Sequence, residues 1–210
     1  MTATAKAGLS RDVIARAALD LTHEGGLDSL SMRKLGTSLG VEAMSIYHYV
    51  ANKDELLDAM LDHLLSKIDL PYDTPERDWE TAIRQGLRAF RDMLLAHPAA
   101  IELFASRPVR SPDSFAVLVW AFKRFTAVGL DRRQAQMALH FAVSFTLGHV
   151  ALERATNDIL RDGDAPEPED FADPEAADFV RIGQTITTDD QFDSGLEAVV
   201  VALRATYGLS

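Results

Sequence analysis

The chain has 210 residues, of which 47% are hydrophobic, and it contains no cysteine. This length gives room for one large or two small domains, and the lack of cysteine excludes disulfides and thiolate chemistry. The formal net charge of −11 argues against a simple basic nucleic-acid binder. No apolar run approaches the length of a membrane span and no signal peptide is evident, so the sequence predicts a cytoplasmic protein.

The negative charge is unevenly distributed along the chain. Residues 1–53 contain six Lys or Arg and five Asp or Glu, whereas residues 158–193 contain twelve acids and two arginines. Interactions between exposed charges are largely screened beyond about 10 Å at ordinary ionic strength. The acidity of the distant segment therefore does not prevent the N-terminal segment from binding phosphates.

The first predicted helix runs from Ser10 to about Glu24. Ser10 is a suitable N-cap, and Gly25-Gly26 is a suitable helix stop. The apolar residues recur at helical spacing: Val13, Ile14, Ala17, Ala18 and Leu21. We expect this helix to support the segment that follows it.

Residues 30–53 indicate two short helices joined by a tight turn, followed by the start of another helix. Leu35 and Leu39 share one apolar face, and the Ser31 hydroxyl can cap the first helix. Gly40 suits the left-handed residue that ends such a helix. This arrangement is a helix-turn-helix, whose second helix enters the DNA major groove.

The second of these helices, Glu42 to about Tyr49, has a face of small and hydroxyl-bearing side chains. Small side chains allow a close approach to base edges, and hydroxyl groups bond to bases or phosphates. This predicted face consists of Ala43, Ser45, Tyr47 and Tyr49.

Cations flank this face at Arg33, Lys34 and Lys53. Asn52 is the expected N-cap of the next helix, and Glu55 is placed to complete a capping box. Lys53 then lies at a helix start, where free N–H groups also favour a phosphate. A small helical hairpin that binds no DNA has a similar pattern, so the pattern alone leaves both interpretations open.

The complete string resembles the tetracycline-repressor (TetR) family of bacterial transcription regulators, and its tetracycline-repressor branch more than the broad family. The resemblance runs through residues 10–67 and continues more weakly at His97-Pro98, Arg107-Pro108 and residues 145–148. The matching residues are Leu30-Ser31-Met32-Arg33-Lys34-Leu35, Leu39-Gly40-Val41-Glu42, Ile46-Tyr47, Val50, Asn52-Lys53 and Leu56-Leu57.

The resemblance implies DNA-facing positions, which are Arg33, Ala43, Ser45, Tyr47, Tyr49 and Lys53. One departure concerns the operator. The family often has a histidine where Tyr49 stands, whereas the histidine of this chain is His48. This difference leaves the operator sequence open.

The helix pattern predicts an all-α protein with two parts. A helix-turn-helix head in residues 1–53 is linked by helix 52–67 to an effector-binding and dimerisation domain in residues 68–210. The expected helices of the second part cover residues 77–96, 98–106, 112–128, 131–157 and 190–207. The intervening residues 158–174 are rich in Asp, Glu, Pro and Gly, and we expect a mobile loop there.

Helices 131–157 and 190–207 have apolar surfaces wider than one core needs. This width favours a homodimer, and the resemblance implies that the two helices pair with their copies as a four-helix bundle. The alternative is that both are central core helices. A dimer also agrees with the two-fold symmetry that helix-turn-helix proteins use to read paired half-sites.

Aromatic residues are frequent in the second part, where we expect an apolar pocket with a few polar groups. Simple filling of the core is the alternative interpretation. The candidate effector-binding residues are His63, Phe90, Phe104, Arg107, Phe141, Phe145 and His149.

Nothing in the sequence indicates an enzyme, a cofactor or a metal site. HExxH, the nucleophile elbow and a phosphate-binding glycine loop are missing. His149 and Glu153 lie four residues apart, but two ligands are too few for a metal. The resemblance places Leu103, Ser144 and Leu152 where the tetracycline repressors have metal-site histidines and an acid, which argues against magnesium-tetracycline as the effector.

The sequence therefore predicts a homodimeric DNA-binding regulator. The interpretation is a repressor that leaves a palindromic operator when an apolar or amphipathic organic molecule binds. The main alternative is a helical ligand- or partner-binding module that has lost DNA binding. An activator or a nucleoid-type binder also remains open, and an enzyme fits least.

Overall fold

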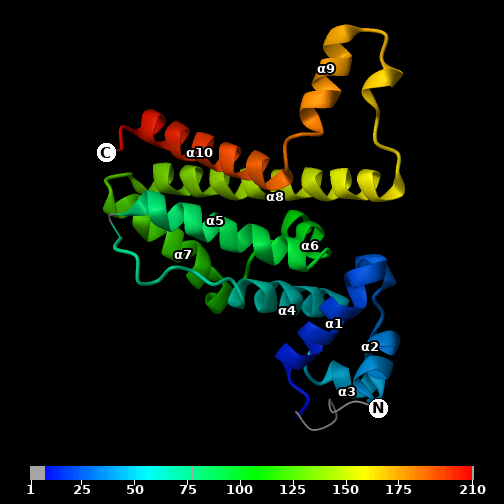
Figure 1. The fold of residues 1–210 in the computed structure, drawn as a ribbon. Coiled ribbons are helices and arrows are strands. Elements are labelled where there is room, and N and C mark those ends of the chain that lie inside the picture. Colours follow the sequence, from blue (N-terminus) through cyan, green and yellow to red (C-terminus); the bar gives the residue numbers. More distant parts are fainter. Residues whose placement is uncertain (1–7, 77, 210) are drawn as a thin grey trace.

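The computed structural model describes residues 8–76 and 78–209. Within these ranges the chain forms only helices, which confirms the all-α class (Figure 1). The elements are α1 (Arg11–Gly25), η2 (Leu27–Ser29), α2 (Met32–Leu39), α3 (Ala43–Tyr47), α4 (Lys53–Ser66), α5 (Trp79–Ala96), α6 (Ala100–Ser106), α7 (Pro112–Ala127), α8 (Arg132–Asp162), η3 (Pro168–Asp170), α9 (Pro174–Gly183) and α10 (Thr188–Tyr207).

The helices α1–α3 form a head at one end of the molecule, and α4 connects this head to the larger helical body (Figure 1). In the body, α8 packs against α5, α7 and α10. Helix α4 contacts α1 on its head side and α6 and α7 on its body side. A displacement of α4 therefore reaches both parts of the molecule.

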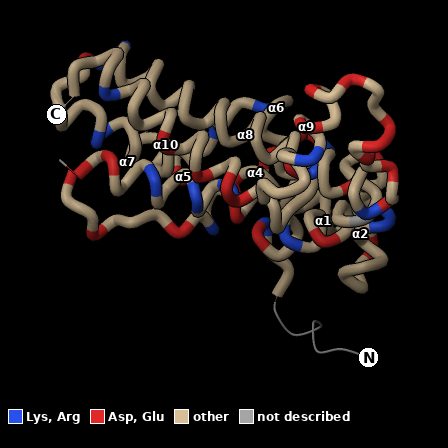
Figure 2. Tube along the Cα trace, turned by 45° about the horizontal axis from the view of Figure 1, so that its top comes forward, with Lys and Arg blue, Asp and Glu red and all other residues tan. Residues whose placement is uncertain are grey.

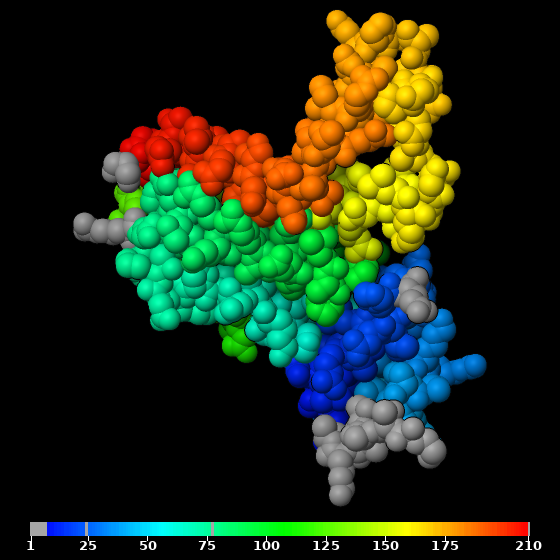
Figure 3. Space-filling model, viewed as in Figure 1, coloured from blue at the N-terminus to red at the C-terminus, as the bar shows by residue number. Residues whose placement is uncertain are grey.

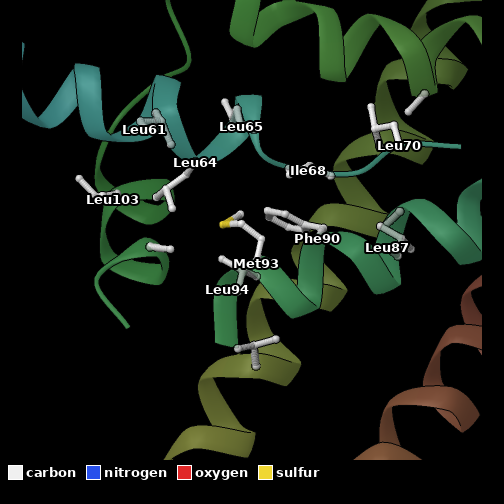
Figure 4. Close-up of a cluster of buried hydrophobic side chains, with 14 of the residues drawn as sticks. Leu61, Leu64, Leu65, Ile68, Leu70, Leu87, Phe90, Met93, Leu94 and Leu103 are labelled. Atoms are coloured by element: carbon white, nitrogen blue, oxygen red, sulfur yellow. The ribbon is translucent and has the colours of Figure 1, made fainter. Parts of the chain in front are cut away.

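The buried apolar side chains form one continuous cluster from the head through α4 to the body. In the head, Ile14, Leu35 and Ile46 are fully buried. Figure 4 shows how Leu64 and Leu65 of α4 face the side chains that α5 and α6 contribute. Because α4 has buried residues on both sides, it belongs to both cores.

Three predicted helix starts are confirmed by their capping bonds. Ser10, Ser31 and Asn52 accept hydrogen bonds from the backbone N–H groups three residues later. The Glu55 carboxylate, however, accepts from the N–H of Ala51 at 2.8 Å and not from that of Asn52. The expected capping box is therefore replaced by a bond to the residue before the cap.

The acidic segment 158–174 differs from the expected mobile loop. Its first residues continue α8 to Asp162, and Gly163 then ends the helix with a left-handed φ of 76°. Residues 168–170 form a 3₁₀ turn, and α9 follows with Asp173 as its N-cap. The composition of the segment was misleading because a glycine with positive φ, rather than the first acidic residue, ends the helix.

The segment from Gly163 through α9 projects from the body as an arm, on the side away from the head (Figures 1 and 3). Figure 2 shows Asp and Glu along the chain that joins α8 to α9. No residue of α9 is buried. The acidic charge that was expected in this half of the chain is thus carried by the arm, far from α3.

Other helix bounds differ from the sequence prediction by a few residues. Helix α3 ends at Tyr47, and η2 was not predicted. Helix α5 begins at Trp79, and position 77, the expected start, lies outside the described residues. Helix α6 begins at Ala100, while α10 begins at Thr188, where the Thr187 hydroxyl caps it.

Helix α8 is long and apolar enough to cross a membrane by length and composition, with a mean hydropathy of 1.3 in its most apolar window. No segment of this kind was expected from the sequence, where no apolar run approaches the length of a membrane span. Core helices of soluble proteins have the same composition, and α8 packs along three other helices of the body.

Candidate DNA interface and effector cavity

The turn between α2 and α3 is fixed by two glycines. Gly40 has a φ of 68°, and the N–H of Val41 donates to the carbonyl of Gly36 at 2.9 Å. This is the Schellman arrangement that ends many helices. The predicted role of Gly40 is thereby confirmed.

Gly36 has a second function that the sequence analysis missed. A Cβ atom at this position would lie 2.8 Å from the carbonyl oxygen of Val41 and 3.2 Å from the amide nitrogen of Ala43. The backbones of α2 and α3 approach each other so closely that only glycine fits. A glycine inside a helix costs about 1 kcal/mol relative to alanine, so its presence in the middle of α2 was the available signal.

The predicted DNA face is only partly exposed. Tyr47 and Tyr49 are exposed, whereas Ala43 and Ser45 are half-buried. The physical reason is the spacing, because side chains two residues apart do not lie on the same side of a helix. The structure thus separates these four residues into two groups.

The outward side of α3 instead carries Met44, Tyr47 and His48, at positions i, i+3 and i+4. Met44 is 69% exposed, the largest exposure of any apolar side chain on this helix. His48 follows the last residue of α3 and is also exposed. From the sequence His48 was noted only as a departure from the family pattern, and Met44 was not proposed as a DNA contact. Helical spacing from Tyr47 indicates that both side chains share its side of the helix.

The two flanking lysines are tied to the 3₁₀ segment η2. The Lys34 ammonium donates to the carbonyl of Ser29 at 2.9 Å, and the Lys53 ammonium donates to that of Leu27 at 3.4 Å. Arg33 is exposed at the start of α2. Arg33 and Lys34 thus lie in the first turn of α2, and Lys53 lies at the start of α4.

Helix α4 carries a row of carboxylates at a spacing of four residues: Asp54, Asp58 and Asp62. Arg107, just after α6, contacts the first two. Its Nε donates to Asp58 Oδ1 at 2.8 Å and its Nη1 to Asp54 Oδ1 at 3.1 Å. The Ser114 hydroxyl of α7 donates to Asp62 at 2.6 Å. Through these hydrogen bonds the three carboxylates attach α4 to the body.

An apolar cavity of about 250 Å³ lies in the body next to the end of α4. Its walls come from α4 and the residues after it, α5, the region of α6, α7 and α8, and Figure 4 shows several of the side chains. The apolar lining includes Leu65, Ile68, Leu70, Leu87, Phe90, Phe104, Leu118, Val143 and Leu147.

The structure brings three of the seven candidate effector residues to this cavity. These are Phe90, Phe104 and Arg107. The two phenylalanine rings meet edge to face, with their centroids 5.2 Å apart. Arg107 lines the cavity and also donates a hydrogen bond to Asp58 of α4.

The other four candidates lie elsewhere. His63 packs between α4 and α1, where its Nδ1 is 2.5 Å from Asp12 Oδ1, and this hydrogen bond holds the pKa of Asp12 below its ordinary value. Phe141 is exposed on α8. Phe145 stacks on Phe192 of α10, and the His149 ring packs against the same ring at a tilt. Burial lowers the pKa of His149.

An ionic cluster with a buried pair, Arg91 and Glu153, and an exposed member, Asp189, lies where α5, α8 and α10 meet. Arg91 donates to Glu153 at 2.6 and 2.9 Å and to Asp189 at 2.7 Å, and its guanidinium lies 4.8 Å from the centre of the Phe192 ring. None of these residues lines the cavity. The cluster fixes the packing of the three helices.

Three polar members of the cavity wall were not predicted from the sequence: Trp120, Gln136 and His140. Gln136 and His140 are four residues apart on α8 and share a side with the lining residues Val143 and Leu147. Polar residues repeated at this spacing on an otherwise apolar helix were the available signal.

A helix-turn-helix head that shares one helix with a cavity-bearing body defines a DNA-binding regulator with its own ligand domain. Comparison with known proteins agrees. A family model described as the tetracyclin repressor-like C-terminal domain matches residues 70–207, and that of the tetR family of bacterial regulatory proteins matches residues 14–60. The chain belongs to the TetR family, whose members are transcription regulators.

Individual relatives align over nearly the whole chain. An HTH-type transcriptional regulator of Saccharopolyspora erythraea is 28% identical, covering 96% of this chain and 87% of the relative. ActR of Streptomyces coelicolor, in complex with actinorhodin, has a TM-score of 0.77 and 26% identity, covering 96% of this chain and all of ActR (100%). BioQ with its natural double-stranded DNA operator has a TM-score of 0.65 and 25% identity, covering 94% and 99%.

Proposed function

We propose that the protein is a homodimeric, cytoplasmic repressor that an organic effector releases from a palindromic operator. In this proposal residues 1–53 form the DNA-binding domain, helix 52–67 is the connection, and residues 68–210 form the effector-binding and dimerisation domain. One observation carries it: α4 begins beside the recognition helix α3 and ends in the wall of the cavity. A ligand with different affinities for two positions of α4 shifts the equilibrium between them.

The proposed DNA contacts are Tyr47, Tyr49, Arg33 and Lys53, which are exposed, with Ala43 and Ser45 closer to the helix packing. BioQ, a structural relative, is known with operator DNA. Since the head has few cations, we expect modest non-specific affinity and specific binding that depends on the combined contacts of two heads.

The proposed dimer forms through α8 and α10. Apolar side chains on the outer sides of these helices are exposed in the single chain: Met137, Phe141, Leu152 and Val201. Pairing of α8 and α10 with their copies buries these side chains, and it places two heads on one face of a duplex, as a palindrome requires.

The effector that fits this cavity is an organic molecule. ActR, a structural relative, binds actinorhodin. Among the described residues, no group of three or more His, Asp or Glu is arranged to hold a metal ion. The effector candidates that remain in this proposal are Phe90, Phe104 and Arg107.

A selection of bound sequences from random duplex DNA by the purified full chain tests this function. The expected result is enrichment of a palindrome whose half-sites are about one helical turn, roughly 10 base pairs, apart. No enrichment even at low salt would favour the alternative, a ligand- or partner-binding module that has lost DNA binding. A reporter gene placed behind the enriched sequence then separates a repressor from an activator.

A further inference from the structure

The polar side chains named in the cavity wall can all donate a hydrogen bond, and none of them carries a negative charge. None of the described lining residues is Asp or Glu, whereas Arg107 is a permanent cation and Trp120 has an indole N–H. Gln136 and His140 each offer a donor as well as an acceptor. A cationic ligand would therefore find no carboxylate in this wall, while a ligand with negative or acceptor oxygens finds several donors.

The indole of Trp120 is an unused donor. This side chain is only 7% exposed, and its Nε1 has no hydrogen-bond partner among the described residues. A buried donor without an acceptor is costly, because it has lost its hydrogen bonds to water. A ligand oxygen within reach of Nε1 would remove this cost.

Arg107 has N–H groups that are not used in its hydrogen bonds to α4, and one of its partners, Asp54, is exposed. Three of its five N–H groups bond to Asp58 Oδ1, Asp54 Oδ1 and the carbonyl oxygen of Asp54, at 2.8, 3.1 and 3.0 Å. The side chain of Asp54 is 81% exposed and that of Asp58 is 25% exposed. Exposed ion pairs contribute little to stability, so Asp54 is the partner that a competing anion displaces more easily.

Resting on the function proposed above, we propose that the effector is an aromatic organic anion, such as a carboxylate or a phenolate, whose oxygen takes Arg107 away from Asp54. The apolar walls hold the ring system, and the Trp120 indole donates to a second oxygen. The exchange replaces one charge-assisted hydrogen bond with another, so the ligand pays little for breaking the first.

The exchange acts where the head joins the body. Arg107 binds both the side chain and the backbone carbonyl of Asp54, in the first turn of α4. Only residues 48–52 separate α3 from α4. When Arg107 turns to the ligand, the first turn of α4 loses its anchor to the body, and the recognition helix that precedes it changes its position relative to the dimer.

Two probes of the same shape test the proposal: 2-naphthoate and 2-naphthamide. A cavity of about 150 Å³ holds benzene, so 250 Å³ accommodates a two-ring aromatic. Calorimetric titration of the full chain at pH 7 should show that naphthoate binds at least about ten times more tightly than naphthamide, because charge-assisted hydrogen bonds are about twice as strong as neutral ones. Arg107→Gln should abolish this preference.

Arg110→Gln is the matched control, because Arg110 is an exposed arginine three residues away that does not line the cavity. It should keep the naphthoate preference. Asp54→Asn removes the competing carboxylate and should tighten naphthoate binding a few-fold without a comparable effect on naphthamide. If circular dichroism shows that Arg107→Gln does not fold, the Asp54→Asn variant provides the test of the anionic effector.

Equal affinities of the two probes, or a naphthoate preference that survives in Arg107→Gln, would overturn the inference. So would unchanged naphthoate binding by Asp54→Asn. If naphthamide binds as tightly and weakens binding to the selected operator, the repressor function is supported and only the anionic nature of the effector is rejected. If no operator is enriched from random duplexes, the proposed function itself falls.

Discussion

Gly36 is the residue whose identity is most directly constrained by the head. The space for a Cβ atom is already filled by the Val41 carbonyl and the Ala43 amide. A single added methyl group must therefore push α3 away from α2. The orientation of the recognition helix depends on this contact.

Gly36→Ala should lower the stability of the head by about 1–3 kcal/mol, the usual range for overpacking, and weaken operator binding as well. Urea unfolding and fluorescence anisotropy with the selected duplex measure the two effects. Gly183→Ala is the control, since a Cβ atom there meets no atom within 4 Å. Unchanged stability and affinity in Gly36→Ala would show that α2 and α3 are not packed as described.

Tyr47 is a predicted DNA contact that is exposed on the outward side of α3, together with Met44. Tyr47→Ala should cost about 1–3 kcal/mol of operator binding, with little change in the unfolding free energy. Tyr72→Ala, at an exposed tyrosine outside the head, should bind the operator like the unaltered chain. Equal affinities of the two variants would remove Tyr47 from the interface.

Two half-buried histidines, His97 and His149, give stability a dependence on pH. Burial lowers the pKa values of His97 and His149 below their ordinary values. Since the unfolded chain binds these protons more readily, the free energy of unfolding should fall as the pH drops from 7 to 5. His149→Leu should reduce this slope in urea unfolding at the two pH values. A stability that rises towards pH 5 would contradict the burial of these rings.

At the scale of elements, local signals in the sequence located most helices. The caps Ser10, Ser31 and Asn52 and the stop at Gly40 are determined within a few residues, so the sequence alone identifies them. The end of α8 and the existence of α9 were missed, because an acidic composition also suits the exposed helices of an arm. Local patterns do not distinguish these two cases.

The cavity was harder to predict than the helices, since it depends on which faces of five chain segments meet. Phe90, Phe104 and Arg107 were predicted from their aromatic or polar type, and the structure places them in the cavity wall. Phe145 and His149 have equally suitable chemistry, yet α10 covers them. Only the packing of α8 between its neighbours decides which of its sides lines the cavity.

The exposed apolar sides of α8 and α10 form the proposed dimer interface. Leu152 is 71% exposed on α8, so its replacement leaves the fold of the single chain intact. Leu152→Glu should convert the proposed dimer to a monomer in sedimentation at micromolar concentration, because it buries a charge in an apolar interface. Val119→Glu, at an exposed apolar position of α7, should remain dimeric. A Leu152→Glu dimer as stable as the original would exclude this interface.

At the scale of the whole molecule, the head and the acidic arm lie on opposite sides of the body (Figure 1), and α4 joins the head to the body. Helix α4 spans from the recognition helix to the cavity. The net charge of −11 therefore does not describe the surface that meets DNA. If the protein is a repressor that an effector releases, binding of a ligand in the cavity and binding of the operator must weaken each other.

The most direct test measures this dependence in both directions. The dissociation constant of the selected operator duplex is determined with and without saturating 2-naphthoate, and that of 2-naphthoate with and without saturating duplex. The account predicts that each ligand weakens the other by the same factor, about 5- to 150-fold for a typical coupling. An operator affinity that stays the same while the cavity is demonstrably filled would contradict it.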